Sequence, residues 1–144
     1  MLHSALLFLH VLATSAWLGA ALWVPGDVRR TLARGRADAD GLGARLGPAL
    51  GLDALAGIAS VLTGFLLLLE MGMARPPFGI SAGIALTFVR LGALAALRSA
   101  VRRVLGRLRA GEAVAAGDPS ARRIAMWSGI AHTAWLLALA GMVW

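Results

Sequence analysis

Four apolar stretches dominate this chain, and each is close to the length that crosses a lipid bilayer. A helix needs roughly 20 apolar residues to span ~30 Å of hydrocarbon. The composition agrees, because 59% of the residues are hydrophobic, 15% are charged, and the mean hydropathy is +0.78. The sequence predicts an all-α integral membrane four-helix bundle that forms one domain, residues 1–144. Its helices are expected at about residues 2–24, 50–70, 80–109 and 122–144, around the apolar stretches Leu2–Val24, Leu50–Leu69, Ile80–Leu97 and Ile124–Trp144.

All fourteen basic residues are arginine, and most of them lie in two of the three connecting loops. Arginine-rich short loops stay on the cytoplasmic side of a membrane. Both termini and the Met71–Gly79 loop are therefore predicted on the periplasmic side, in a bacterial inner membrane given the strong Ala, Gly and Arg bias. The basic loops are expected to contact anionic lipids. No nucleic-acid partner is expected, because an arginine run such as Arg98–Arg109 beside a spanning segment usually sets topology.

Proline and glycine mark the expected helix ends. Pro25–Gly26 is predicted to end the first helix, and Pro76–Pro77 excludes a helix from the short outer loop. Gly111–Ser120 is predicted to be a turn whose last residue caps the fourth helix. The glycines within residues 41–51 fit either close helix packing or an irregular lead-in to the second helix, and Pro48 favours the lead-in.

Three ionisable side chains lie well inside the apolar stretches. At a helical rise of 1.5 Å per residue, His10 lies ~12 Å, Arg90 ~15 Å and His132 ~18 Å from the outer face. An arginine at the bilayer centre costs at least ~2.5–3.5 kcal/mol, so such groups usually face a cavity, a cofactor or a partner. These residues are therefore the main candidates for function.

Helical spacing places His10 and Trp17 on one face of the first helix, and His132 and Trp135 on one face of the fourth. If both faces turn inward, two imidazoles, two indoles and the Arg90 guanidinium surround one space. Two histidines from different helices are usual axial ligands of haem b, and an arginine pairs with a propionate. The predicted site is therefore haem iron held by His10 and His132, with Trp17 and Trp135 as walls and Arg90 as a propionate partner or catalytic group.

Other interpretations of these side chains remain open. The two deep histidines fit a copper ion, with His3, Met71 and Met73 as further ligands, or proton transfer to a quinone. Each histidine also fits a plain hydrogen bond to a neighbouring helix.

Arg90 equally fits a bond to a helix carbonyl. Asp53 and Glu70 are predicted to be interfacial, because they lie near the ends of their segment. The absence of Cys, Lys and Tyr excludes thiolate, Schiff-base and phenolic chemistry. No P-loop, zinc signature or Ser-His-Asp arrangement is present, so hydrolysis and phosphoryl transfer are not expected.

The first helix reads LHVLATSAWLGAALWVP, with His10, Trp17 and Pro25 at intervals of seven and eight residues. It resembles the opening helix of the HemJ-type protoporphyrinogen IX oxidases, four-helix membrane proteins that bind haem through a histidine in that helix. A similar helix occurs in CopD-like copper-resistance proteins. The resemblance covers about 25 residues, since the rest matches only in hydropathy. It implies that His10 is the haem ligand or a catalytic histidine, and that Trp17 and Pro25 are structural.

The chain departs from the HemJ-type pattern in two places. That family carries an important lysine in its third helix, where this chain offers only Arg90, which cannot act as a base. The family's last helix ends in Lys-Pro, whereas this one ends in GMVW, and His132 has no counterpart. The resemblance therefore supports the fold and a haem-linked site more than that enzyme activity.

The predicted function is an inner-membrane haem- or porphyrin-linked redox protein. It would oxidise porphyrinogen or pass electrons to a quinone or a protein partner. The chain is an oxidoreductase only if this haem-linked function is correct. The alternatives are a CopD-like copper-handling protein and a non-catalytic anchor subunit of a larger membrane complex. A homo-oligomer is compatible with each of them.

Overall fold

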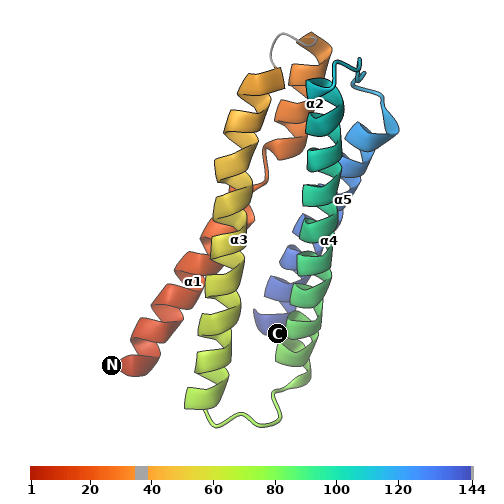
Figure 1. The fold of residues 1–144 in the computed structure, drawn as a ribbon. Coiled ribbons are helices and arrows are strands. Elements are labelled where there is room, and N and C mark those ends of the chain that lie inside the picture. Colours follow the sequence, from red (N-terminus) through yellow and green to blue (C-terminus); the bar gives the residue numbers. More distant parts are fainter. Residues whose placement is uncertain (35–38, 144) are drawn as a thin grey trace.

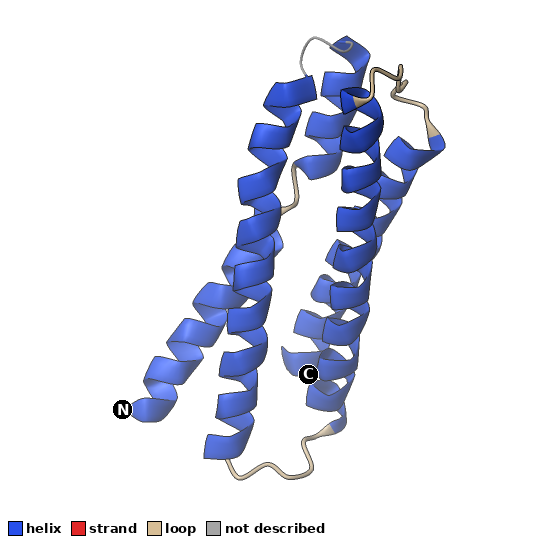
Figure 2. Ribbon diagram, in the orientation of Figure 1, coloured by secondary structure: helices blue, strands red, loops and turns tan. Residues whose placement is uncertain are grey.

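A computed structural model describes residues 1–34 and 39–143 of the chain. The helices are α1 (Leu2–Ala20), α2 (Val24–Arg34), α3 (Ala39–Glu70), α4 (Phe78–Arg109) and α5 (Pro119–Val143) (Figure 1). Short connections join α1 to α2, α3 to α4 and α4 to α5, and no strand forms among the described residues (Figure 2). The helical segments Leu2–Arg34, Asp40–Glu70, Phe78–Arg109 and Pro119–Gly141 are long and apolar enough to cross a membrane. The prediction of a multi-pass, all-helical membrane protein is therefore confirmed.

The first expected helix is two helices in the structure. α1 ends at Ala20, and α2 starts at Val24, so Pro25 lies in the first turn of α2. Proline fits a first turn, because its missing N–H would have no intrahelical acceptor there. The residue expected to end one helix therefore helps to start the next.

The second spanning helix begins eleven residues earlier than expected. α3 starts at Ala39 and continues through Pro48, where an irregular lead-in was predicted. Leu42 and Leu46 lie in this early part and are 0% and 1% exposed. The burial of this face outweighs the helix-breaking tendency of a single proline.

α5 also begins earlier than expected, at Pro119. The Ser120 N–H donates to Asp118 Oδ1 over 2.8 Å, so Asp118 is the N-cap and Ser120 lies inside the first turn. The predicted Ser120 cap is therefore wrong by two residues.

The helices pack as two pairs, α1 along α3 and α4 along α5, with α2 in contact with both α3 and α5. An apolar core at the α2 end includes Val24, Leu97, Val104 and Ile124. In the other half of the molecule, the N-terminal part of α1 diverges from α4 and α5 (Figure 1). Large apolar side chains there are exposed on the outer surface, as expected of helices that face lipid; examples are Leu2, Phe8, Leu62, Phe88 and Leu136.

Candidate functional site: a buried polar junction

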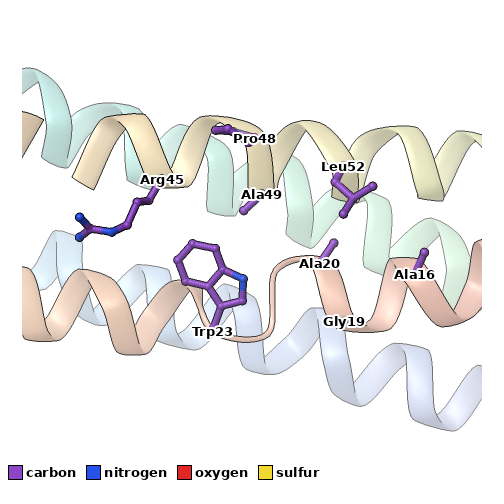
Figure 3. Close-up of a pocket in the computed structure, with 8 residues that line it drawn as sticks. All are labelled: Ala16, Gly19, Ala20, Trp23, Arg45, Pro48, Ala49 and Leu52. Atoms are coloured by element: carbon purple, nitrogen blue, oxygen red, sulfur yellow. The ribbon is translucent and has the colours of Figure 1, made fainter. Parts of the chain in front are cut away.

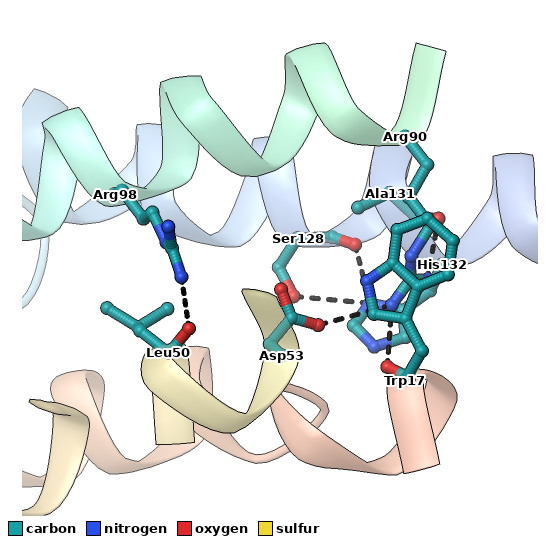
Figure 4. A network of polar contacts seen from close by, with 8 residues as sticks. All are labelled: Trp17, Leu50, Asp53, Arg90, Arg98, Ser128, Ala131 and His132. Carbon is teal, nitrogen blue, oxygen red and sulfur yellow. Dashed lines mark hydrogen bonds and ion pairs between the residues drawn. The ribbon is translucent and has the colours of Figure 1, made fainter. Parts of the chain in front are cut away.

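The side chain of Arg90 joins three other helices near the middle of the molecule (Figure 4). Its Nη1 donates to the Ala131 carbonyl of α5 over 3.1 Å, and its Nη2 donates to the Trp17 carbonyl of α1 over 2.7 Å. The guanidinium carbon lies 4.4 Å from the centroid of the Trp17 ring, a cation–π contact. Arg90 is only 2% exposed, so it does not reach water along the surface of its helix.

Asp53 of α3 completes the charge pair. Its Oδ1 accepts from Arg90 Nη2 over 3.3 Å, and the carboxylate is 1% exposed. The prediction that Asp53 is interfacial is wrong, because α3 starts at Ala39 and places Asp53 within the helix instead of near its end. A second guanidinium, that of Arg98, donates to the Leu50 carbonyl one turn away from Asp53. The carboxylate therefore lies in the field of two arginines.

His132 borders the same junction from α5 (Figure 4). Its Nδ1 donates to the Ser128 carbonyl over 2.7 Å, which makes Nδ1 the protonated nitrogen of the neutral ring. Nε2 is buried and has no hydrogen-bond partner among the described residues. Ser128 Oγ, one turn earlier on α5, also lies 3.4 Å from Nδ1.

Several other polar atoms at this junction are buried without a hydrogen-bond partner in the described part of the chain: Trp17 Nε1, Asp53 Oδ2 and Arg90 Nε. With His132 Nε2, the set has two donors and two acceptors. An unsatisfied buried polar group costs about 1–3 kcal/mol. The junction therefore holds both donors and acceptors that no described residue satisfies.

His10 lies in a different place, in the seam between α1 and α3. Its Nδ1 lies 3.1 Å from the Ser60 carbonyl and 3.0 Å from Thr63 Oγ1. Gly64 makes room for the ring, since a Cβ there would lie 3.0 Å from His10 Cε1. The carbonyl bond assigns the proton to Nδ1 and leaves Nε2 as the available nitrogen.

The structure does not bring His10 and His132 together. His10 contacts α3 at Ser60, whereas His132 lies at the junction that contains Asp53 (Figure 4). Ser60 and Asp53 are seven residues, or ~10 Å, apart along α3. Trp17 joins the Arg90 junction through its carbonyl and its ring. Trp135 is half-buried and makes no hydrogen bond or cation–π contact with the junction among the described residues.

The predicted outer copper ligands lie at the far end of the bundle. His3 Nδ1 pairs with Glu70 Oε2 over 2.7 Å, and both side chains are partly exposed. Met71 follows directly and is 49% exposed, and Met73 is two residues further along the loop. Among the described residues, no three His, Cys, Asp or Glu side chains are close enough together to hold a metal ion.

The fold and the junction define a class: a multi-pass helical membrane protein whose spanning helices meet at a buried, charged polar site. Compared with family models, curated proteins and solved structures, the chain matches none of them. The resemblance of its first helix to HemJ-type and CopD-like proteins therefore stays a prediction.

Proposed function

We propose that this chain is a membrane-embedded redox protein that holds one haem b or porphyrin at His10. One observation carries the proposal: the His10 ring is fixed through Nδ1 on the Ser60 carbonyl, which leaves Nε2 to bind iron. Metal-ligating histidines usually donate their other ring N–H to a carbonyl or carboxylate in this way. The haem would supply the one-electron chemistry.

The residues around His10 fit one axial ligand rather than two. Ser60 and Thr63 hold the imidazole in one tautomer and orientation, and Gly64 lets α3 approach the ring. His132 lies at the polar junction ~10 Å further along the bundle, so it does not complete a pair of axial ligands in this arrangement.

Arg90 has a positioning role in this proposal. Its two Nη atoms are bonded to Trp17, Asp53 and Ala131, which ties α1, α3 and α5 to α4. These bonds use three of its five N–H groups, so Nε and one N–H of Nη1 have no partner among the described residues. The junction therefore sets the spacing of the helices that flank His10.

Optical spectra of the detergent-purified protein, oxidised and dithionite-reduced, test the proposal. After expression with ample haem, we expect a Soret band and reduced α and β bands. His10→Ala should lose these bands, and the exposed His3→Ala should keep them. Thr63→Val should keep the haem and shift its reduction potential, because Thr63 contacts the same ring nitrogen. Loss of haem in His132→Ala would instead favour the predicted site with two histidine ligands. A wild-type protein that binds no haem would overturn the proposal.

Copper handling is the second candidate, favoured by the His3–Glu70 pair beside Met71. An imidazole and a carboxylate suit Cu(II), and a thioether suits Cu(I). Electron paramagnetic resonance of the protein loaded with one equivalent of Cu(II) should then show nitrogen coupling that His3→Ala removes. A chain that binds neither haem nor copper would favour the anchor-subunit alternative.

A further inference from the structure

A groove of about 550 Å³ runs along the outer surface between α1 and α3 (Figure 3). Its walls are small or apolar: Ala16, Gly19 and Ala20 on α1, and Ala49 and Leu52 on α3. A Cβ built on Gly19 would meet no atom within 4 Å, so the groove is open at that position. These residues take no part in the polar junction, which lies on the inner side of the same two helices.

One end of the groove is polar. Trp23 and Arg45 lie there (Figure 3), and Trp23 is 43% exposed. Arg45 Nε and Nη2 donate to the two Asp27 oxygens over 2.9 and 3.2 Å, which holds the guanidinium at this position. The groove is therefore apolar along its length and carries a fixed cation and an indole at one end.

This arrangement follows the layers of a membrane leaflet. From Arg45 to Leu52 the groove covers seven residues of α3, or ~10 Å, which fits within the ~15 Å of hydrocarbon in one leaflet. Tryptophan is enriched at the level of the lipid headgroups. Arg29 and Arg30 are exposed on α2 at the same end of the bundle. Together with Arg45 they give three positive charges there against the one negative charge of Asp27.

We propose that the groove holds one acyl chain of an anionic phospholipid, with the lipid phosphate at the Arg45 end. The apolar walls cover the chain, and Arg45, Arg29 and Arg30 attract the headgroup. The proposal does not depend on haem or copper, and its failure would leave the proposed function untouched.

Native mass spectrometry tests the groove. The protein is released from micelles that contain equal amounts of phosphatidylglycerol and phosphatidylcholine, and retained lipid is counted. Gly19→Leu adds a branched side chain at the open wall of the groove, where its Cβ meets no atom within 4 Å. We expect it to reduce retained phosphatidylglycerol about tenfold. Gly92→Leu is the matched control, because it also adds a leucine at an exposed spanning position with open space. Equal retention in the two variants would overturn the proposal.

A second pair of variants tests the headgroup. Arg29→Gln with Arg30→Gln should lower the preference for phosphatidylglycerol about fivefold, and Arg122→Gln with Arg123→Gln on α5 should leave it unchanged. Brominated phosphatidylglycerol should quench the tryptophan fluorescence of the wild-type protein more than that of Trp23→Phe. Such a difference would support binding at this site. Retention of phosphatidylcholine equal to that of phosphatidylglycerol would contradict the proposal. A dimer of the wild-type protein that dissociates in Gly19→Leu would also contradict it, because a second copy of the chain would then fill the groove.

Discussion

At the α2 end of the molecule, buried apolar side chains from four helices form a continuous core, which includes Val28, Leu46, Leu97, Val104 and Ile124. Toward the chain termini, the α1–α3 and α4–α5 pairs diverge (Figure 1), and the contacts change character. His10 bonds to the Ser60 carbonyl, and His3 pairs with Glu70. The Arg90–Asp53 junction lies between the two regions.

Different forces act on helix packing in water and in lipid. Where water reaches the helices, apolar burial stabilises their packing at ~25 cal/mol per Å². In lipid, an apolar helix face gains little from leaving the hydrocarbon, so small residues and polar contacts set the helix positions. Gly57 against Trp17 and Gly64 against His10 are such close approaches. The α2 end has a continuous apolar core, whereas a few specific contacts join the helices in the other half of the molecule.

Removal of the buried guanidinium should have the largest effect. Arg90→Ala leaves Asp53 charged, buried and unpaired, so we expect a loss of about 3–5 kcal/mol in the free energy of unfolding. Thermal unfolding in detergent measures it, with Arg102→Ala as an exposed control. The double variant Arg90→Met with Asp53→Leu should recover most of the loss. If the double variant is as unstable as Arg90→Ala, the carbonyl bonds matter more than the charge pair.

Leucine truncation should separate the two regions within one helix. Leu46 is 1% exposed in the core, and its replacement by alanine should cost about 2–5 kcal/mol. Leu62, four turns further along α3, is 57% exposed, and Leu62→Ala should cost less than ~1 kcal/mol in the same denaturation experiment. Similar losses would show that the spanning part has an apolar interface of its own.

A single methyl group should reveal the close approach of α1 and α3. A Cβ on Gly57 would lie 2.9–3.1 Å from indole atoms of Trp17, and overpacking of this kind costs about 1–3 kcal/mol. Gly51→Ala on the same helix meets no atom within 4 Å and should be neutral or stabilising. The difference in thermal midpoint between these two variants measures the contact. A tolerated Gly57→Ala would mean that the Trp17 ring moves freely, and its stacking on Arg90 would then be loose.

The sequence predicted the class of fold well, because length and hydropathy determine which segments can span a membrane. It also identified Arg90, His10 and His132 as the deep ionisable groups. Asp53 was missed because its place depends on where α3 begins, and Pro48 made that start look later than it is.

The sequence could not predict the hydrogen-bond acceptors of Arg90, for a different reason. Two of them are backbone carbonyls, those of Trp17 and Ala131, and every residue carries such a group. The separation of His10 from His132 depends on which helices form pairs. Hydropathy does not encode that choice, because each spanning helix offers lipid-compatible side chains on most of its surface.

The smallest effect is expected outside the spanning segments, at the cap of α5. The pKa of Asp118 is lowered because the Ser120 N–H donates to its carboxylate, and the Arg107 guanidinium adds a 3.0 Å ion pair. A lowered pKa means that the folded state favours the charged form. The contribution to stability is therefore complete above the unfolded pKa of about 3.9 and is lost as the pH falls through the lower folded value.

Asp118→Asn separates the charge from the cap. The amide keeps an oxygen for the Ser120 N–H but has no proton to titrate, so the stability difference from the wild type should shrink between pH 7 and pH 3. Asp118→Ala removes the cap as well and should remain less stable than Asp118→Asn at both pH values. Thermal midpoints of the three proteins across this range provide the test. A difference between wild type and Asp118→Asn that does not change with pH would show that the hydrogen bond alone, without the charge, stabilises the start of α5.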